Sequence, residues 1–532
     1  MSLHLNKHPS FQGRKGPVVI LVADGVGVAP AGPSNAVTEA NTPTLDWLAE
    51  QTLYTELAAH GTAVGLPSDD DMGNSEVGHN ALGAGRIFAQ GAKLVNQAIA
   101  SGAVFDTDVW QQAISQGKDN TLHLLGLHSD GNVHAHTQHL YQLMAAAAEQ
   151  GVRECCLHIL LDGRDVDARS ALKYIGETEK NISSINQQHN ANFRIASGGG
   201  RMQITMDRYE ADWDMVQRGY ECHTHDAVTA LYESSGKDDQ NLPQFVIAND
   251  GEAVGKMNDG DAVIFFNFRG DRAIEISLAY ERDDFEKFDR NSVRKHPKVY
   301  YAGMLQYDGD ELVPNNYLVN PPNIDRTMGE FLCAEGVKSF AISETQKYGH
   351  VTFFWNGNRS GYLDESLEEY IEIPSDNVEF NEAPAMKARE ITEKTIELIE
   401  RGDFQFGRLN IANGDMVGHT GDLAAAIKAM EVVDECVAKL LEAIKANNGI
   451  LLYTADHGNA DIMYTEKNGI KSPKTSHTLS PVPFAIFDPN YNGEYRLNPP
   501  SDAGLTHIAA TALNLLGFVA PEDYQPSLIK FS

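Results

Sequence analysis

Short runs of Val, Ile, Leu and Phe alternate with amphipathic segments along almost the whole chain, and this alternation constrains the fold most. The runs predict strands at residues 18–23, 121–127, 156–161, 193–197, 262–268, 299–305, 339–343, 408–412, 450–455 and 483–487. Predicted helices at 385–402 and 421–449 lie between them, the second ending in Asn-Asn-Gly, a typical stop signal. This pattern predicts an α/β fold of mainly parallel sheets flanked by helices.

The chain's charge and composition exclude several classes of partner. A net charge of −32 argues against nucleic acid and anionic membranes as partners. No apolar run is long enough to span a membrane, and the N-terminal segment lacks the apolar core of a signal peptide. Five cysteines without a C-x-x-C pair fit a reduced, cytoplasmic protein. Because the chain as a whole is negatively charged, an anionic substrate would need local cations, supplied by metal ions or clustered arginines.

Three predicted strands are each followed by an aspartate: Asp24, Asp415 and Asp456. Ligands of open α/β sheets bind beyond the carboxyl ends of the strands, so we expect these side chains to meet. His419 lies one helical turn after Asp415, and His457 directly follows Asp456. Such donors suit Mn²⁺, Zn²⁺, Co²⁺ or Mg²⁺, and their number predicts a two-metal site. Each aspartate alone is equally open to interpretation as a helix N-cap.

Ser75 lies in the glycine-rich stretch DDDMGNSEVGHNALGAGR, residues 69–86. A serine alkoxide beside a metal ion is a competent nucleophile at neutral pH. The helix predicted after Ser75 would present its N-terminal amides to a phosphate. The alternative is that Ser75 only caps this helix. His477, which precedes the last predicted strand, is a further candidate nitrogen ligand.

A set of ordered motifs then connects the chain to a known family. They are ADGVG, DMGNSEVGHNALGAGR, SDGNVHAH, LDGRDV, NFRGDR, ETQKYGHVTFFWNG, NGDMVGHTGD, TADHGNAD and SHTLSPVPF. Together they span about residues 17–520 and resemble the cofactor-independent phosphoglycerate mutases, which belong to the alkaline phosphatase superfamily. The resemblance implies interconversion of 3-phosphoglycerate and 2-phosphoglycerate in glycolysis and gluconeogenesis, with no bisphosphoglycerate primer.

The resemblance also assigns roles to individual residues. It implies that Ser75 is the nucleophile and is phosphorylated during turnover. It implies two divalent ions, Mn²⁺ or alternatively Mg²⁺, Co²⁺ or Zn²⁺, and no organic cofactor. One ion would be held by Asp415, His419 and His477, and the other by Asp24, Ser75, Asp456 and His457. The residues implied at the substrate are His134, Arg164, Asp165, Arg201, Arg208, Arg269, Arg272 and Lys347.

Two of these residues have expected chemical roles beyond binding. Asp165 is the candidate general acid and base, and Lys347 is expected to offset charge on the phosphoryl oxygens. The remaining histidines of the His-rich run, His128, His136 and His139, receive no role, and we expect them to be structural or on the surface.

The expected metal ligands lie towards both ends of the chain and the arginines in its middle, which predicts a discontinuous domain. Residues 1–89 and 322–532 are expected to form a metal-binding, phosphatase-like domain that carries Ser75. Residues 90–321 are expected to form an inserted α/β domain that binds the substrate. We expect a monomer, because the large negative charge opposes self-association.

Two alternatives remain open from the residues. One is another enzyme of the same superfamily: a metal-dependent phosphomonoesterase, a phosphopentomutase-like enzyme or a sulfatase. The sequence contains no Cys-x-Pro-x-Arg or Ser-x-Pro-x-Arg motif of the sulfatase kind. The other is a protein that binds metal or phosphosugar without catalysis.

Overall fold

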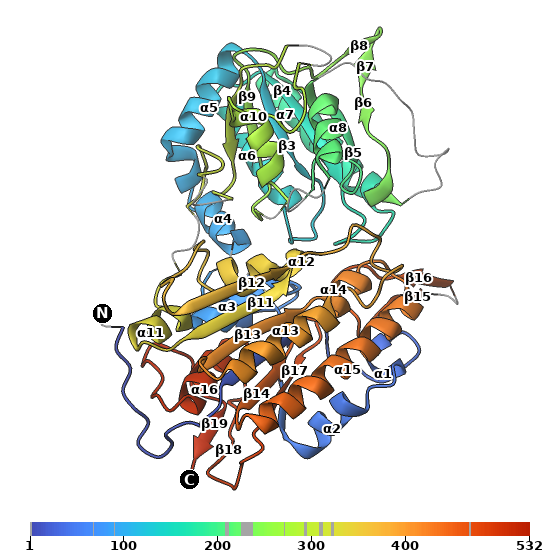
Figure 1. Ribbon diagram of the computed structural model, residues 1–532. Coiled ribbons are helices and arrows are strands. Elements are labelled where there is room, and N and C mark those ends of the chain that lie inside the picture. Colours follow the sequence, from blue (N-terminus) through green and yellow to red (C-terminus); the bar gives the residue numbers. More distant parts are fainter. Residues whose placement is uncertain are drawn as a thin grey trace. The chain divides into compact units, whose positions relative to one another are not determined.

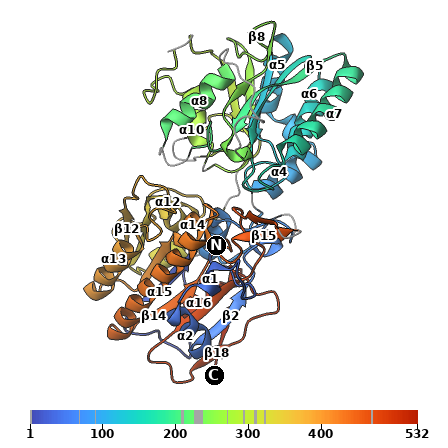
Figure 2. The same ribbon diagram turned by 90° about the vertical axis from the view of Figure 1, so that its right-hand side faces the viewer.

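The computed structural model describes residues 3–66, 69–89, 91–207, 212–224, 238–270, 272–291, 295–307, 312–320, 324–467 and 470–532. The chain divides into two compact units, which we call the outer unit (residues 1–90 with 323–532) and the inserted unit (residues 91–322). Figures 1 and 2 show the elements of each unit in two views. None of the helices among the described residues has the length and apolar character needed to cross a membrane.

The outer unit is built on a seven-stranded sheet with the order β12-β11-β13-β1-β14-β17-β2. The strands are β1 (Val18–Ala23), β2 (Leu53–Leu57), β11 (Ser339–Glu344), β12 (Glu368–Ile373), β13 (Phe406–Ile411), β14 (Ile450–Thr454) and β17 (Val482–Phe487). The five strands from β12 to β14 are parallel, whereas β17 is antiparallel to β14 and β2 is antiparallel to β17. The central strand β1 is buried along its whole length and lies between β13 and β14. The carboxyl ends of these three strands therefore share one edge of the sheet.

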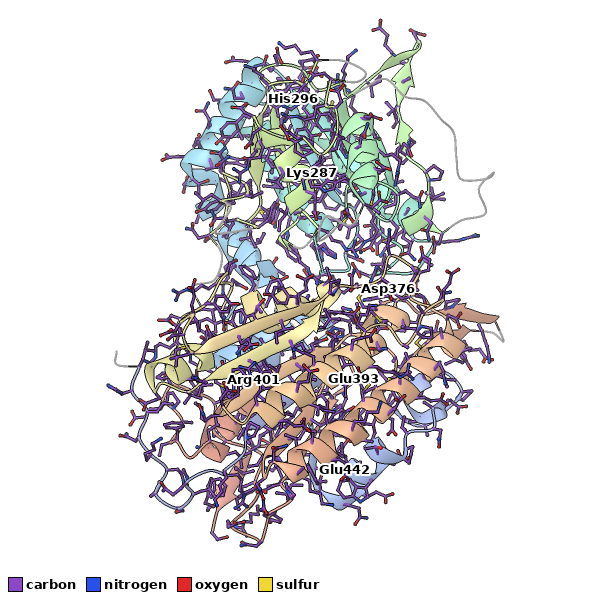
Figure 3. All side chains as sticks on the ribbon, viewed as in Figure 1. Lys287, His296, Asp376, Glu393, Arg401 and Glu442 are labelled. Carbon is purple, nitrogen blue, oxygen red and sulfur yellow. The ribbon has the colours of Figure 1, made fainter. Side chains whose placement is uncertain are left out.

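Helices cover this sheet, and their outward faces carry charge. The helices are α1 (Ala36–Glu39), α2 (Pro43–Gln51), α3 (Ser75–Ala84), α11 (Met328–Ala334), α12 (Thr345–Gly349), α13 (Ala388–Arg401), α14 (Asn413–Gly418), α15 (Leu423–Ala446) and α16 (His507–Leu515). Helices α13 and α15 lie side by side in both views (Figures 1 and 2). Their exposed residues Glu393, Arg401 and Glu442 are labelled in Figure 3. The alternation of apolar and charged positions thus orients both helices on the sheet.

Short elements complete the outer unit. They are the hairpin of β15 (Tyr464–Lys467) and β16 (Ile470–Pro473), the pair β18 (Tyr495–Leu497) and β19 (Ile529–Phe531), and the helical turns η1 (Gly61–Val64) and η4 (His350–Phe354).

The inserted unit has a six-stranded sheet with the order β10-β9-β3-β4-β5-β6. Its strands are β3 (Leu122–Leu127), β4 (Glu154–Leu161), β5 (Asn192–Gly200), β6 (Phe245–Val246), β9 (Ala262–Phe265) and β10 (Tyr300–Gly303), with the separate pair β7 (Ala248–Asn249) and β8 (Glu252–Ala253). All sheet neighbours are parallel except β6. The helices are α4 (Gly91–Ala100), α5 (Asp108–Asp119), α6 (Thr137–Glu149), α7 (Ala171–His189), α8 (Trp213–Thr224) and α10 (Ile274–Glu281), with turns η2 (Ala103–Asp106) and η3 (Asp239–Asn241).

The predicted fold class is confirmed, and each predicted strand overlaps a strand of the structure. The sequence pattern missed the two edge strands of the outer sheet, β2 and β12. Their sequences, LYTEL and EEYIEI, mix charged and apolar residues, and most of their side chains are only half-buried. An edge strand lacks a neighbour on one side, so it does not need the continuous apolar run that marks a central strand.

Candidate metal centre and active site

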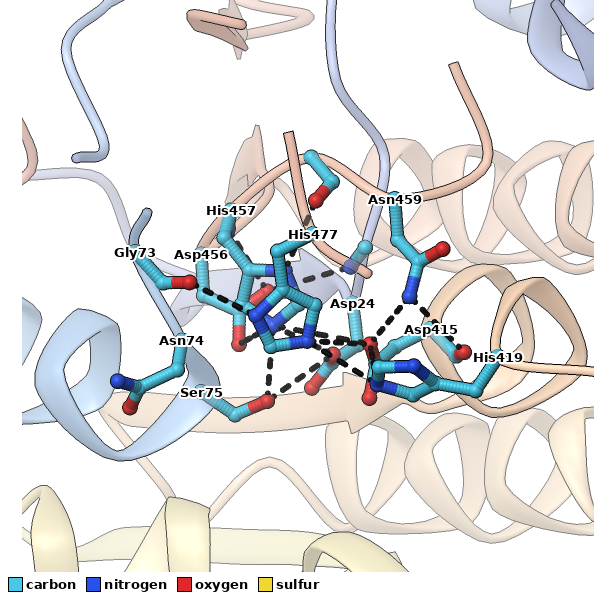
Figure 4. A network of polar contacts seen from close by, with 12 residues as sticks. Asp24, Gly73, Asn74, Ser75, Asp415, His419, Asp456, His457, Asn459 and His477 are labelled. Atoms are coloured by element: carbon cyan, nitrogen blue, oxygen red, sulfur yellow. Dashed lines mark hydrogen bonds and ion pairs between the residues drawn. The ribbon is translucent and has the colours of Figure 1, made fainter. Parts of the chain in front are cut away.

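The carboxyl ends of β1, β13 and β14 bring three buried aspartates together. Asp24 directly follows β1, Asp456 lies two residues after β14, and Asp415 lies in the short helix α14 that follows β13. Ligand atoms of Asp24, Asp456 and His457 lie within 4.8 Å of one another, and the same is true of Asp415, His457 and His477. Figure 4 shows these side chains pointing toward a common centre. The predicted convergence of strand-end aspartates is therefore present in the structure.

The three histidines of this cluster all present the same ring nitrogen to its centre. The Nδ1 atoms of His419, His457 and His477 lie 2.6, 3.3 and 2.8 Å from backbone carbonyl oxygens. A carbonyl only accepts hydrogen bonds, so each Nδ1 carries a hydrogen, and in the neutral form of each ring Nε2 keeps a lone pair. This tautomer is the one that a metal-binding histidine uses when a backbone carbonyl orients its ring.

The inward-facing atoms are almost all acceptors. The Nε2 atoms of His419 and His477 are 3.0 Å apart, and they lie 3.0 and 3.2 Å from Asp415 Oδ1. Lone pairs and carboxylate oxygens packed this closely repel unless a proton or a metal cation lies among them. The donors are carboxylate oxygens, imidazole nitrogens and one hydroxyl, a set that suits divalent metal ions. The observed residues therefore fit metal binding.

Ser75 directs its hydroxyl at this cluster and does not cap its helix. The N-cap of α3 is Asn74, whose side chain accepts a hydrogen bond of 3.1 Å from the Val77 N–H. Ser75 is the first helical residue, and its Oγ lies 2.9 Å from His457 Nε2 and 3.3 Å from Asp24 Oδ1. The capping interpretation is therefore wrong, and the hydroxyl is placed among the candidate ligands.

A buried lysine supplies positive charge at the same place. Lys347, from α12, donates to Asp24 Oδ1 at 2.9 Å, to Asp415 Oδ2 at 2.8 Å and to Ser75 Oγ. Burial, with the charge of Asp456 adding to it, raises the pKa of Asp24 to about 6. Burial also opposes ionisation of Asp415, but in the metal-free cluster the positive charges of protonated His419 and of Lys347 outweigh it and hold its pKa well below the usual value. The cluster thus depends on cations to keep its carboxylates ionised.

Polar side chains that the sequence pattern did not single out hold the three carboxylates. They are Asn410, His79 and Asn459, which lie 2.7 Å from Asp24 Oδ2, 3.3 Å from Asp456 Oδ2 and 3.0 Å from Asp415 Oδ1. Two of these residues could have been recognised from the sequence, because His79 lies one helical turn after Ser75 and Asn459 belongs to the DHGN motif. Asn410 could not have been recognised in this way, because it lies inside an apolar strand.

The inserted unit carries a second cluster, at the carboxyl ends of β4 and β5. Arg201 is fully buried and donates to Asp162 Oδ1 at 2.9 Å and to Asp165 Oδ2. Asp162 also accepts the backbone N–H groups of Arg164 and Asp165 and the hydroxyl of Ser129. Asp162 and Ser129 were not predicted, although both lie in motifs quoted above. These contacts fix the expected acid–base residue Asp165 against a guanidinium group.

The predicted arginines act together on one histidine of the inserted unit. His134 is buried, and burial lowers its pKa well below the ordinary value. The positive charges of Arg201, Arg269, Arg272 and Arg164 lower it further. Four guanidinium groups that act on one neutral imidazole suit an anion, because guanidinium groups bind carboxylate and phosphate in a bidentate manner.

Comparisons with known proteins show which proteins the chain resembles. Residues 16–520 match the model of the Metalloenzyme superfamily. The chain is 50% identical to a probable 2,3-bisphosphoglycerate-independent phosphoglycerate mutase of Leptospira interrogans, over 99% of this chain and 100% of the relative. It is 47% identical to the corresponding mutase of Trypanosoma brucei brucei, over the full length of both chains. The crystal structure of Leishmania mexicana phosphoglycerate mutase at low cobalt concentration superposes with a TM-score of 0.94, at 45% identity, covering 99% of this chain and 100% of that one.

The chain belongs to the 2,3-bisphosphoglycerate-independent phosphoglycerate mutase family. The candidate residues of this mutase divide between the two units. The outer unit holds Asp24, Ser75, Lys347, Asp415, His419, Asp456, His457 and His477. The inserted unit holds His134, Arg164, Asp165, Arg201, Arg269 and Arg272. Lys347, expected among the substrate residues, contacts the candidate metal ligands. Arg208 lies outside the described residues.

The histidines to which the mutase resemblance gave no role are held by local contacts. The Nε2 atom of His128 is 2.7 Å from Thr178 Oγ1, and that of His139 is 2.5 Å from Asn96 Oδ1. His136 is the N-cap of α6. These contacts explain the positions of the three rings without a metal ion.

Proposed function

We propose that this chain interconverts 3-phosphoglycerate and 2-phosphoglycerate by way of a phosphoryl group carried on Ser75, with no bisphosphoglycerate primer. The observation that carries the proposal is the direction of Ser75 Oγ, which lies among carboxylates and imidazoles and is not used as a helix cap. Relatives that match over the full chain are named for this activity.

In the proposed reaction the phosphoryl group moves twice. Ser75 Oγ attacks the phosphorus of 3-phosphoglycerate in line, forming a serine–phosphate bond and breaking the bond to O3. The 2-hydroxyl of the retained glycerate then attacks the phosphoserine, forming the bond to O2 and releasing Ser75. Bound divalent cations supply the positive charge that lowers the pKa of the Ser75 hydroxyl and offsets charge on the phosphoryl oxygens. Lys347, which donates to Ser75 Oγ, adds a fixed charge there.

The residues of the inserted unit have binding and proton-transfer roles in this proposal. Arg269 and Arg272 bind the substrate carboxylate while the glycerate reorients. Asp165, held by Arg201, gives a proton to O3 as that bond breaks and takes one from the 2-hydroxyl as it attacks. His134 stays neutral beside the arginines, so it serves as a hydrogen-bond partner.

We propose Mn²⁺ as the resident ion at two positions, one held by Asp415, His419 and His477 and the other by Asp24, Ser75, Asp456 and His457. Oxygen and nitrogen donors without sulfur support Mn²⁺, Mg²⁺ or Co²⁺ more than thiophilic metals. We also propose a cytoplasmic monomer. A net charge of −32 opposes self-association, and all five cysteines are free thiols.

The test is one incubation of EDTA-treated full-length protein with 3-phosphoglycerate, with and without added Mn²⁺, in the absence of bisphosphoglycerate. Both 2-phosphoglycerate and free phosphate are followed in the same tube. We expect metal-dependent 2-phosphoglycerate with little free phosphate. Free phosphate as the main product would instead identify a hydrolase, and no product with metal bound would identify a binding protein.

Matched serine variants locate the nucleophile. Ser75→Ala should abolish mutase turnover, whereas Ser183→Ala, on the exposed face of α7, should leave it unchanged. Appreciable turnover in Ser75→Ala at unchanged metal content would refute the role of Ser75.

A further inference from the structure

A continuous row of hydrogen bonds runs through the interior of the inserted unit, away from the residues assigned above. We call it the buried histidine row, and its members, all buried, are Asp261, His123, His158, Ser197, His223 and Thr205. The successive distances are 3.2, 2.9, 2.6, 3.3 and 3.0 Å. The row begins before β9, crosses β3, β4 and β5, and ends beyond β5 by way of α8.

All hydrogen bonds of the row are donated in the same direction, and Asp261, its first member, sets that direction. Both carboxylate oxygens of Asp261 accept backbone N–H groups, and Oδ2 also lies 3.2 Å from His123 Nε2. His123 Nε2 therefore carries the donated hydrogen, and its Nδ1 accepts from His158 Nε2. The same logic makes the Ser197 hydroxyl donate to His158 Nδ1 and accept from His223 Nδ1. His223 Nε2 is then an acceptor, so the last bond must be donated by the hydroxyl of Thr205.

This arrangement requires neutral imidazoles, because a neutral ring donates at one nitrogen and accepts at the other. Burial lowers the pKa of His123 and lowers that of His158 well below the ordinary value. Burial, with a smaller contribution from His123, lowers the pKa of His223 to about 3. All three rings are therefore neutral near pH 7.

The last member of the row has an unusual backbone. Thr205 has a φ of +68°, a conformation that β-branched residues rarely adopt, so neighbouring groups must hold it. Its N–H donates to the Met215 carbonyl at 3.1 Å, and its hydroxyl donates to His223. Gly219 of α8 packs so closely that an added Cβ would lie 2.1 Å from Thr205 Oγ1. Three contacts thus fix the conformation of this turn.

The turn at Thr205 leads directly to Arg272, one of the candidate anion-binding arginines. The carbonyl of Met206, the next residue, accepts a hydrogen bond of 2.7 Å from Arg272 Nη1. We propose that the buried histidine row is a positioning device, in which His223 and Ser197 hold the Thr205 turn and thereby aim the Arg272 guanidinium at the substrate anion. This inference rests on the proposed function, which assigns Arg272 to the substrate. Ser197 and His223 act through Thr205 and are positioning residues.

The test separates the hydroxyl from the shape of the side chain. Thr205→Val keeps the branched shape and removes the donor, whereas Thr205→Ser keeps the donor. We expect Thr205→Val to raise KM for 3-phosphoglycerate about tenfold with kcat changed less than about twofold, because a binding contact is lost and the chemical step is not. Thr205→Ser should remain near the KM of the unaltered chain.

Ser197→Ala breaks the row at a distance from Arg272 and should raise KM in the same direction. Thr178→Val is the matched control, since it also removes a buried threonine hydroxyl bonded to a histidine ring, that of His128. We expect the control to lower the melting temperature without changing KM. An unchanged KM in both Thr205→Val and Ser197→Ala, with a stability loss like that of the control, would overturn the proposal.

A binding measurement keeps this test apart from the test of function. Full-length proteins that carry Ser75→Ala, with and without Thr205→Val, are titrated with 3-phosphoglycerate and with inorganic phosphate. We expect Thr205→Val to weaken 3-phosphoglycerate binding about tenfold. If the unaltered chain produced no 2-phosphoglycerate, the proposed function would fail, while the difference in Kd would still decide the role of the row. If Thr205→Val left the Kd of each ligand unchanged, the proposal would be overturned.

Discussion

The Nε2 atoms of His419 and His477 face each other at 3.0 Å, and the Nδ1 of each ring is hydrogen-bonded to a backbone carbonyl. When both rings are neutral with the hydrogen on Nδ1, neither of the facing nitrogens carries a hydrogen and their lone pairs point at each other. A cation that accepts both lone pairs resolves this contact. The pair therefore marks one candidate metal position.

Removing one of these nitrogens should remove one ion. We expect His477→Asn to lower bound Mn²⁺ from two ions per chain to about one and to reduce activity by at least 10-fold, a loss typical of altered metal sites. Metal analysis of the purified, dialysed protein measures the stoichiometry. His189→Asn, at the end of α7, is the control and should retain both ions. Two ions in His477→Asn would contradict the assignment.

Lys347 should stabilise the metal-free protein more than the metal-bound one. Its Nζ lies 2.9 Å from Asp24 and 2.8 Å from Asp415, so Lys347→Met leaves buried carboxylates without a cation. We expect the metal-free variant to lose about 3–5 kcal/mol of unfolding free energy. Added Mn²⁺ should recover part of this loss, giving a larger rise in melting temperature than in the unaltered chain.

Thermal melts with and without Mn²⁺ measure both effects. Lys394→Met, which breaks an exposed pair with Glu397, should change stability by less than about 0.5 kcal/mol. A Lys347→Met protein as stable as this control would contradict the prediction.

The close approach of α3 to Asp456 should exclude any side chain at Gly78. A Cβ on Gly78 would lie 2.8 Å from both the Cβ and the carbonyl oxygen of Asp456. We therefore expect Gly78→Ala to displace Asp456 and to weaken metal affinity by about 10-fold or more. Calorimetric titration of the metal-free protein with Mn²⁺ measures this.

Gly176 offers the opposite case on a helix. Nothing lies within 4 Å of an added Cβ there, so Gly176→Ala should stabilise α7 by about 0.5–1 kcal/mol and leave metal affinity unchanged. Equal metal affinities in the two variants would show that the contact with Asp456 is unimportant.

Buried neutral histidines should make the stability of the inserted unit depend on pH. Burial lowers the pKa of His128 to about 4, and burial with the charge of His136 lowers that of His139 to about 3. Each is near 6.5 when unfolded, so the unfolded chain binds more protons between these values. The stabilisation is complete above pH 6.5 and is lost as the pH falls toward 4.

The loss amounts to roughly 2 kcal/mol for each histidine between pH 6.5 and 4.5. Urea unfolding followed by circular dichroism across this range measures the slope. We expect His139→Gln, which cannot be protonated, to reduce the slope by about one proton. An unchanged slope in this variant would contradict the assignment to His139.

The sequence allowed prediction of features that combine an apolar run with a polar residue at its end. Asp24 and Asp456 were found this way, because parallel topology makes the carboxyl ends of strands meet. Asn410 could not be found, because it lies inside β13 and its partner Asp24 is distant in sequence. Its role depends on which strands are neighbours, which apolar patterning does not determine.

The buried histidine row was hidden for the same reason. His123 and His158 each interrupt an apolar strand, where a single histidine carries no signal. They meet because His123 is paired with Cys156, which places His158 two residues further along the same face of β4. Only strand order and register bring such residues together.

The central position of β1 has a consequence for how the protein is made. β1 leaves the ribosome first, but its two neighbours, β13 and β14, are synthesised only at residues 406–411 and 450–454. At ~5–20 residues per second, this entirely apolar strand waits on the order of a minute for its partners. The inserted unit, contiguous from residue 91 to 322, can complete its own sheet during that time. The nascent chain is therefore most prone to aggregation before the later candidate metal ligands, from Asp415 to His477, have been translated, when no complete metal site can yet stabilise it.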